Sequence, residues 1–414
     1  MSLKYRLVVM NFLQFAIWGA WLISLGAYLG GGLRFEGFQI GSFFATMGIA
    51  SLFMPGVMGI IADRWIPAQK LLGICHFLAA VFLVLAAPYR DYNTLYSLIL
   101  CSVMFYMPTI ALSNSVAYNA LAKGGYNIVK DFPPIRVWGT IGFICSMILV
   151  DLLGFANSAY QLYFSAGLGF VLSIYSFTLP NCDIITNNAK KSWVDYLGLR
   201  AFTLFKKKKM AIFFVFSMML GMSLQITNAF ANDYLTNFFG KNPIYKGTFG
   251  VEHANILISL SQISETLCIL LIPFFLRRFG IKKVMLISMF AWVLRFALLG
   301  SGNPGGGVWL LILSMVVYGV AFDFFNISGS LFVENETDSS IRSSAQGVFM
   351  IMTNGFGAFI GSYVAGWVVD KAGWPNSWFI FAGYSLIVAI VFAFIFKYKH
   401  DPAQFKKMCS DKIY

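Results

Sequence analysis

Charge is scarce in this chain. Of its 414 residues, 11% are charged, with 30 basic and 17 acidic side chains, whereas soluble domains carry roughly 25% charged residues. Hydrophobic residues make up 58% of the sequence. So few charges cannot cover so much apolar surface in water, which excludes a soluble enzyme and a disordered chain. We therefore expect an all-α membrane protein that crosses the bilayer many times.

Cysteine and histidine patterns are equally sparse. The six cysteines are scattered, and no CxxC or Cys/His spacing occurs, which excludes a disulfide scaffold and argues against a metal site. The three histidines do not converge in sequence, and we interpret His76 and His253 as packing and boundary residues. No nucleophile–base pair or cofactor motif is apparent. We expect no cofactor and no enzymatic activity.

Long apolar runs dominate what remains. A bilayer crossing takes ~20 predominantly apolar residues, and the chain contains twelve runs of about this length. They lie at roughly 7–30, 38–62, 70–88, 95–120, 136–154, 159–180, 210–232, 252–276, 283–301, 308–332, 344–369 and 375–397. The sequence thus predicts twelve transmembrane helices, and an even number places both termini on the same side.

The basic residues indicate which side that is. If the termini are cytoplasmic, 23 of the 30 Lys and Arg residues fall on the cytoplasmic side and five on the other. Such an excess is typical of cytoplasmic loops. The asymmetry predicts cytoplasmic termini, and it accounts for the net charge of +13 without a nucleic-acid partner.

One polar segment divides the chain near its middle. It covers residues 181–209 and ends in four consecutive lysines, Lys206 to Lys209, which we expect to lie at anionic headgroups. The predicted organisation is therefore a six-helix half at 1–180, a linker at 181–209, a second six-helix half at 210–399 and a tail at 400–414. Such a plan suggests an internal duplication.

The loop between the second and third runs carries a motif. Gly59 to Arg64 has the form GxxxDR and resembles the loop 2–3 signature of the major facilitator superfamily. The resemblance implies that Asp63 and Arg64 form a conformational latch, in which the carboxylate caps a neighbouring helix in the outward-open state. The copy departs from the pattern, because Ile66 replaces a glycine and Arg277 takes the acidic position in the second half.

Three acidic residues fall within predicted spans. Glu265 and Asp323 lie well inside, whereas Asp151 lies near the outer end of its run, where it would reach the headgroups. Ionisable groups in the bilayer are costly and mark function by default. Glu265 and Asp323 are therefore candidates for proton coupling.

Polar and aromatic residues three or four positions apart share a helix face with these acids or form similar stripes on other helices. The first stripe is Arg136, Thr140 and Phe143, on a helix that we expect to begin after Pro133–Pro134. The other stripes are Gln225 and Asn228; Gln262 and Glu265; and Tyr318, Phe322 and Asp323. Interhelical hydrogen bonding is the structural alternative. Amides beside aromatic rings suit a neutral solute with a flat ring and polar edges.

At these stripes the sequence resembles the bacterial nucleoside:proton symporter family, in segments 131–143, 225–228, 261–265 and 321–329. The resemblance implies proton-driven uptake of purine and pyrimidine nucleosides, such as uridine and adenosine, across the inner membrane by a monomer. It places Arg136, Thr140, Phe143, Gln225, Asn228, Gln262, Glu265, Tyr318 and Phe322 at the substrate, and Asp323 at the proton.

Three other functions remain open from the residues. A sugar or oligosaccharide symporter shares the architecture and would use carboxylates and aromatic rings in the same way. A drug exporter would prefer a cavity with fewer amides. A solute-sensing receptor would need a larger soluble domain than the linker or the tail provides.

Overall fold

The computed structural model describes residues 2–182, 199–337 and 341–398, and in these ranges every regular element is a helix. Nine of the helices described are long and apolar enough to cross a membrane. The elements are α1 (Leu3–Gly19), α2 (Leu25–Ala27), η1 (Tyr28–Gly32), α3 (Gly37–Arg64), α4 (Ala68–Ala86), α5 (Tyr92–Lys123), α6 (Ile128–Leu152), α7 (Tyr160–Ser176), η2 (Leu199–Lys206), α9 (Lys208–Asp233), η3 (Tyr234–Phe238), η4 (Phe239–Lys241), α10 (Phe249–Glu252), α11 (Ala254–Ser301), α12 (Val308–Glu336), α13 (Arg342–Met350), η5 (Ile351–Gly357), α14 (Ala358–Ala372) and α15 (Asn376–Ile395).

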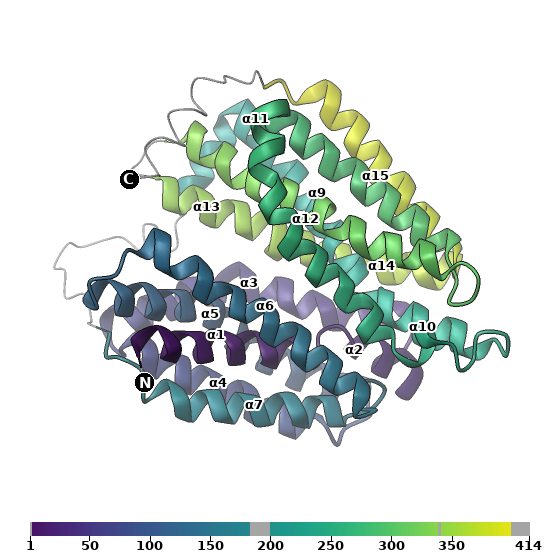
Figure 1. The fold of residues 1–414 in the computed structure, drawn as a ribbon, viewed down its shortest axis with the longest axis horizontal. Coiled ribbons are helices and arrows are strands. Elements are labelled where there is room, and N and C mark those ends of the chain that lie inside the picture. Colours follow the sequence, from purple (N-terminus) through teal and green to yellow (C-terminus); the bar gives the residue numbers. More distant parts are fainter. Residues whose placement is uncertain (1, 183–198, 338–340, 399–414) are drawn as a thin grey trace.

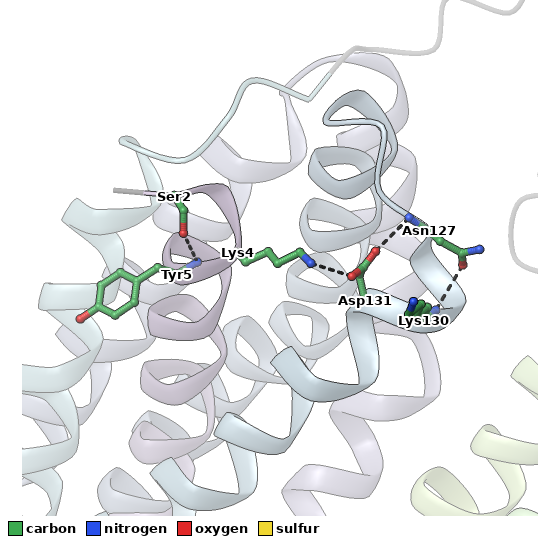
Figure 2. A network of polar contacts seen from close by, with 6 residues as sticks. All are labelled: Ser2, Lys4, Tyr5, Asn127, Lys130 and Asp131. Carbon is green, nitrogen blue, oxygen red and sulfur yellow. Dashed lines mark hydrogen bonds and ion pairs between the residues drawn. The ribbon is translucent and has the colours of Figure 1, made fainter.

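The start of α6 differs from the sequence prediction. Asn127 caps the helix by accepting the backbone N–H of Lys130 at 3.2 Å, and Asp131 binds Lys4 of α1 at 2.7 Å (Figure 2). These contacts hold the first turn, so α6 begins at Ile128 and both Pro133 and Pro134 lie inside it. The prediction that the helix begins after the prolines was wrong, because a polar cap in water sets the first turn whereas apolarity marks only the part in lipid.

Gly280 divides α11 into two arms, residues 254–279 and 281–301. Its φ of 76° and ψ of 167° lie outside the helical region, and a positive φ is readily adopted only by glycine. The chain therefore reverses within a single residue after the basic pair Arg277–Arg278. The short basic turn expected near this point exists, although it is tighter than the predicted gap of 277–282.

The helices form two groups (Figure 1). In the first group, α1 packs on α6, and α4 packs on α5 and α7. In the second group, the two arms of α11 pack on α12 and α15, while α9 packs on η5 and α14. Each apolar helix thus buries one face against its own group.

The two groups meet along a limited set of helices. The main contacts are α3 with α14 and η5, α6 with α11, and α2 with α9. In Figure 1 the groups converge at the end where α2 and α10 lie, and their ribbons diverge toward the end where α1 begins and α15 ends. We call the end where α1 begins and α15 ends the terminal end. We call the end where α2 and α10 lie the opposite end.

Candidate functional site

The first group contributes an arginine and two aromatic rings. The guanidinium of Arg136 on α6 lies 3.9 Å from the ring centroid of Phe15 on α1. Phe143, two turns further along α6, is 8% exposed, and its ring meets the edge of Trp18 at 6.5 Å and 84°. Thr140 lies between them and is half-buried. The predicted stripe on α6 therefore exists as a contiguous face next to α1.

The second group of helices places a carboxylate near Arg136. Glu265 on α11 is half-buried and lies close enough to Arg136 for their charges to interact. No direct ion pair joins them among the described residues. The two charges come from different groups of helices, so the site bridges the groups.

On α11, other residues supply the interhelical hydrogen bonds. Ser264 donates from its hydroxyl to the carbonyl oxygen of Val316 on α12, and the hydroxyl of Ser261 lies 3.1 Å from the sulfur of Met315. Gln262 and Glu265 are only partly covered. The structural alternative of interhelical bonding therefore applies to the serines and leaves Glu265 for another role, whereas Gln262 also interacts with the hydroxyl of Tyr318 on α12.

The α9 pair is arranged as its spacing predicts. Nδ2 of Asn228 donates to Oε1 of Gln225 at 3.0 Å. Gln225 is buried and Asn228 is half-buried. This bond orients the two amides and leaves three donor hydrogens, one on Asn228 and two on Gln225, and further acceptor capacity for a ligand.

The α12 stripe combines rings and an acid. Tyr318 and Phe322 stack with centroids 5.9 Å apart and planes at 8°. Asp323 is 3% exposed, and its Oδ2 atom has no hydrogen-bond partner among the described residues. Its charge interacts with that of Glu265. Asp323 and Glu265, the two candidates for proton coupling, therefore belong to one electrostatic cluster.

A cavity adjoins Phe322 in the second group. It encloses about 380 Å³ of empty space, including the part open to solvent. It is lined by Leu220, Gly221, Leu224, Trp292, Ala321, Phe322, Phe325, Asn326, Thr353 and Asn354. Asn326 lies one turn beyond Asp323 on α12, but the stripes predicted from the sequence do not include Asn326, Thr353 or Asn354. Thr353 and Asn354 belong to the π-helical element η5, and single π-helical turns often occur at functional sites. Sequence spacing does not reveal such a turn.

The two residues of the predicted conformational latch lie away from this cluster. Asp63 and Arg64 form the last turn of α3, where both are exposed. Asp63 makes no hydrogen bond or ion pair within the described residues. The structure therefore does not bring these two residues together with the ligand-binding candidates.

Asp151 has a partner that the sequence did not predict, although His253 lies at a helix boundary as expected. Oδ2 of Asp151 on α6 lies 2.8 Å from Nδ1 of His253, the residue before α11, and the aspartate side chain is 3% exposed. Asp151 thus contacts the second group of helices and is buried there. Its position near a helix end gave no signal for a partner that is 102 residues away in sequence.

Apolar helices of membrane-crossing length surround a cluster of amides, aromatic rings and opposed charges that joins two groups of helices. This arrangement defines a multi-pass membrane transport protein. The family described as Nucleoside H+ symporter matches residues 1–401. The chain belongs to this family, and its relatives are transporters, not enzymes.

Two curated relatives are half identical to the chain. The nucleoside permease NupG of Escherichia coli (strain K12) is 51% identical over 407 residues, covering 97% of each chain. The xanthosine permease of the same organism is 51% identical over 413 residues, covering 98% of this chain and 99% of the permease. A crystal structure of the D323A mutant of the nucleoside transporter NupG superposes with a TM-score of 0.93 at 50% identity, covering 96% of this chain and all of the other.

Proposed function

We propose that this protein takes up nucleosides together with protons by alternating access. The observation that carries the proposal is the opposition of Arg136 on α6 and Glu265 on α11, surrounded by the amides and rings of α9 and α12. A site shared by two groups of helices is exposed to one side or the other when the groups rock against each other.

The substrates are purine and pyrimidine nucleosides, such as uridine and adenosine. Phe143, Tyr318 and Phe322 offer ring faces for stacking a base. Gln225, Asn228 and Gln262 offer amides for its polar edges, with Arg136, Thr140 and Glu265 completing the contacts. The names of the relatives support this class, since one is a nucleoside permease and the other a xanthosine permease.

Proton coupling belongs to Asp323 and Glu265. A buried carboxylate is far less costly in the occluded state when it is protonated. Loading of the proton from outside and its release inside would then link the proton gradient to rocking of the two groups. The unpartnered Oδ2 of Asp323 supports this role, because no donor in the described part of the chain bonds this oxygen to hold the charged form.

The topology is twelve crossings with both termini in the cytoplasm of a bacterial inner membrane. The nine long helices, together with α1, α7 and the second arm of α11, make up twelve candidate crossings. The terminal end is then cytoplasmic, and contacts between the groups close the opposite, external end. With this topology we infer an inward-facing state, and we expect the transporter to act as a monomer.

The moving units are residues 1–180 and 210–399, joined by the linker at 181–209. Positions 183–198 of this linker, and the tail at 400–414, lie outside the described residues. Asp63 and Arg64 would form their latch in the outward-facing state, in which the terminal end closes. The exposure of Asp63 in the present state is consistent with a carboxylate that is released from the latch.

Counterflow of labelled uridine into proteoliposomes tests the proposal. Vesicles loaded with unlabelled uridine should accumulate labelled uridine transiently. A proton gradient directed inward, with the more acidic side outside, should drive uptake into vesicles that contain no uridine. Competition by adenosine, by sucrose and by a cationic dye separates the nucleoside, sugar and drug functions. Counterflow of sucrose without counterflow of uridine would refute the proposal.

A further inference from the structure

Arg295 is a buried cation inside a membrane-crossing helix. It lies in the second arm of α11 and is 2% exposed. A charge at such a position is costly and requires partners. Within the described ranges, no carboxylate forms an ion pair with Arg295.

Its partners are a helix backbone, two side chains and an aromatic ring. Nη1 of Arg295 lies 3.5 Å from the hydroxyl of Ser261 and 3.9 Å from the sulfur of Met315. Nη1 of Arg295 donates to the carbonyl oxygen of Ser314 at 2.7 Å, and the Ser314 hydroxyl donates back to the carbonyl oxygen of Arg295 at 3.0 Å. The guanidinium carbon lies 4.6 Å from the ring centroid of Tyr318. A cation this close to a ring in a desolvated setting is strongly attracted to it.

Tyr318 links Arg295 to the candidate site. Its ring stacks on Phe322, meets the edge of Trp292 at 6.0 Å and 90°, and interacts with the side chain of Gln262 through its hydroxyl. Two other residues expected at the substrate, Phe322 and Gln262, therefore depend on the placement of this ring. Arg295 holds that ring and is not itself among the residues that line the cavity.

We propose that Arg295 is a positioning residue of the nucleoside site, whose cation fixes Tyr318 and, through it, Phe322 and Gln262. The inference rests on the proposed nucleoside transport. Stability alone gives little reason for a cation here, because an apolar side chain of similar length would avoid the cost of burying charge. The expected benefit is therefore in substrate binding.

Arg295→Met tests this directly. It keeps the apolar stem and removes the guanidinium, while the Ser314 carbonyl retains its bond within the helix. We expect the apparent KM for uridine to rise about 10-fold, on the scale of a desolvated cation–π contact, with the maximal rate changed less than about twofold. The melting temperature in detergent should stay the same or rise. Arg295→Lys keeps the cation and should give a KM between those of the wild-type protein and Arg295→Met.

A matched control is available on the same helix. Ser288 is fully buried in α11 and donates to the carbonyl oxygen of Ala321 on α12. Ser288→Ala removes a contact between the same two segments without touching Tyr318. It should lower the melting temperature and leave the KM unchanged, which is the pattern expected of a purely structural contact.

A double-mutant cycle establishes the route of the effect. In a Tyr318→Leu background, Arg295→Met should raise the KM no further, since the ring it holds is absent. A wild-type KM in Arg295→Met, or a full additional rise in the Tyr318→Leu background, would overturn the proposal. If Arg295→Met does not accumulate in the membrane, Arg295→Lys in the two backgrounds decides the question in the same way.

The wild-type measurement keeps this test separate from the proposed function. Wild-type protein that shows no counterflow of any nucleoside refutes the proposed function itself. Wild-type protein that transports uridine, beside an Arg295→Met variant with the same KM, refutes only the role of Arg295.

Discussion

The carboxylate of Asp370 on α14 accepts the backbone N–H of Gly37 at the start of α3, with an oxygen–nitrogen distance of 2.6 Å. Its second oxygen accepts the next backbone N–H, that of Phe38, at 2.7 Å. An acid at a helix N-terminus is stabilised by unpaired amides and by the helix dipole. Because the two helices belong to different groups, the contact closes the opposite end of the molecule.

Replacing Asp370 should therefore loosen that end. Hydrogen bonds to a charged group contribute about 1.5–3 kcal/mol each, so Asp370→Ala should raise the population of molecules open at this end by at least about 10-fold. The reporter is Ala27→Cys in a cysteine-free background, because Ala27 is fully buried at the same end, where its carbonyl oxygen accepts Nδ2 of Asn237. Labelling by an impermeant maleimide should accelerate.

Asp91→Ala is the matched control for that experiment. Asp91 is also an acid at a helix N-terminus at this end, but it accepts the backbone N–H of Thr94 within its own helix, α5. Hydrogen bonds from Thr94 hold the pKa of Asp91 below its ordinary value, so the residue is charged at neutral pH. Equal labelling rates in Asp370→Ala and Asp91→Ala would show that the α14–α3 contact does not hold the end closed.

Close packing of α3 on α14 predicts a second way to prevent closure. A Cβ atom on Gly41 would collide with the carbonyl oxygen of Ser362, which is fully buried. Small residues allow such a close approach of helix backbones. Gly41→Val should therefore prevent closure of the opposite end and reduce uridine uptake by at least about 10-fold, while the protein still inserts into the membrane.

Gly383→Ala controls for loss of a helical glycine, since a Cβ atom at that position in α15 meets nothing within 4 Å. It should retain wild-type uptake. Normal uptake by Gly41→Val would mean that α3 and α14 need not meet during transport.

The sequence predicts the helices better than it predicts their partners. Backbone polar groups in lipid must bond within their own segment, so long apolar runs indicate helices reliably. The same runs do not mark where a helix begins in water, as the early start of α6 at Ile128 shows. Spacing finds residues on one helix face, such as Gln225 and Asn228.

Contacts between distant segments leave no such periodic signal. His253 binds Asp151 across 102 positions, and Arg295 meets Tyr318 across the turn between α11 and α12. Each residue could be recognised as ionisable in or near a span, but its partner depends on how the helices pack. Pairing across helices therefore required the structure.

The cavity beside Phe322 predicts a further substrate contact. Asn326 is half-buried, lines the cavity and lies one helical turn beyond Phe322. An amide that bonds a nucleoside edge contributes about 1–3 kcal/mol when its loss leaves a polar group unpaired. Asn326→Leu should therefore raise the KM for uridine by about 10-fold or more in proteoliposome uptake.

Ile312→Ala serves as the comparison, because Ile312 lies on the same helix with 39% of its surface exposed and does not line the cavity. Its KM should match that of the wild-type protein. An unchanged KM in Asn326→Leu would place the substrate elsewhere.

Asp323→Asn should separate substrate movement from proton coupling. The amide keeps the shape of the carboxylic acid but cannot release a proton, and position 323 is buried, with 3% of the aspartate exposed. Uridine counterflow should persist within about threefold of wild type, whereas accumulation driven by an inward pH gradient should disappear. Glu265→Gln, measured in parallel, shows which acid carries the proton, since Glu265 interacts electrostatically with both Arg136 and Asp323. If Asp323→Asn still concentrates uridine against a gradient while Glu265→Gln does not, the coupling group is Glu265, and the unpartnered oxygen of Asp323 serves another purpose.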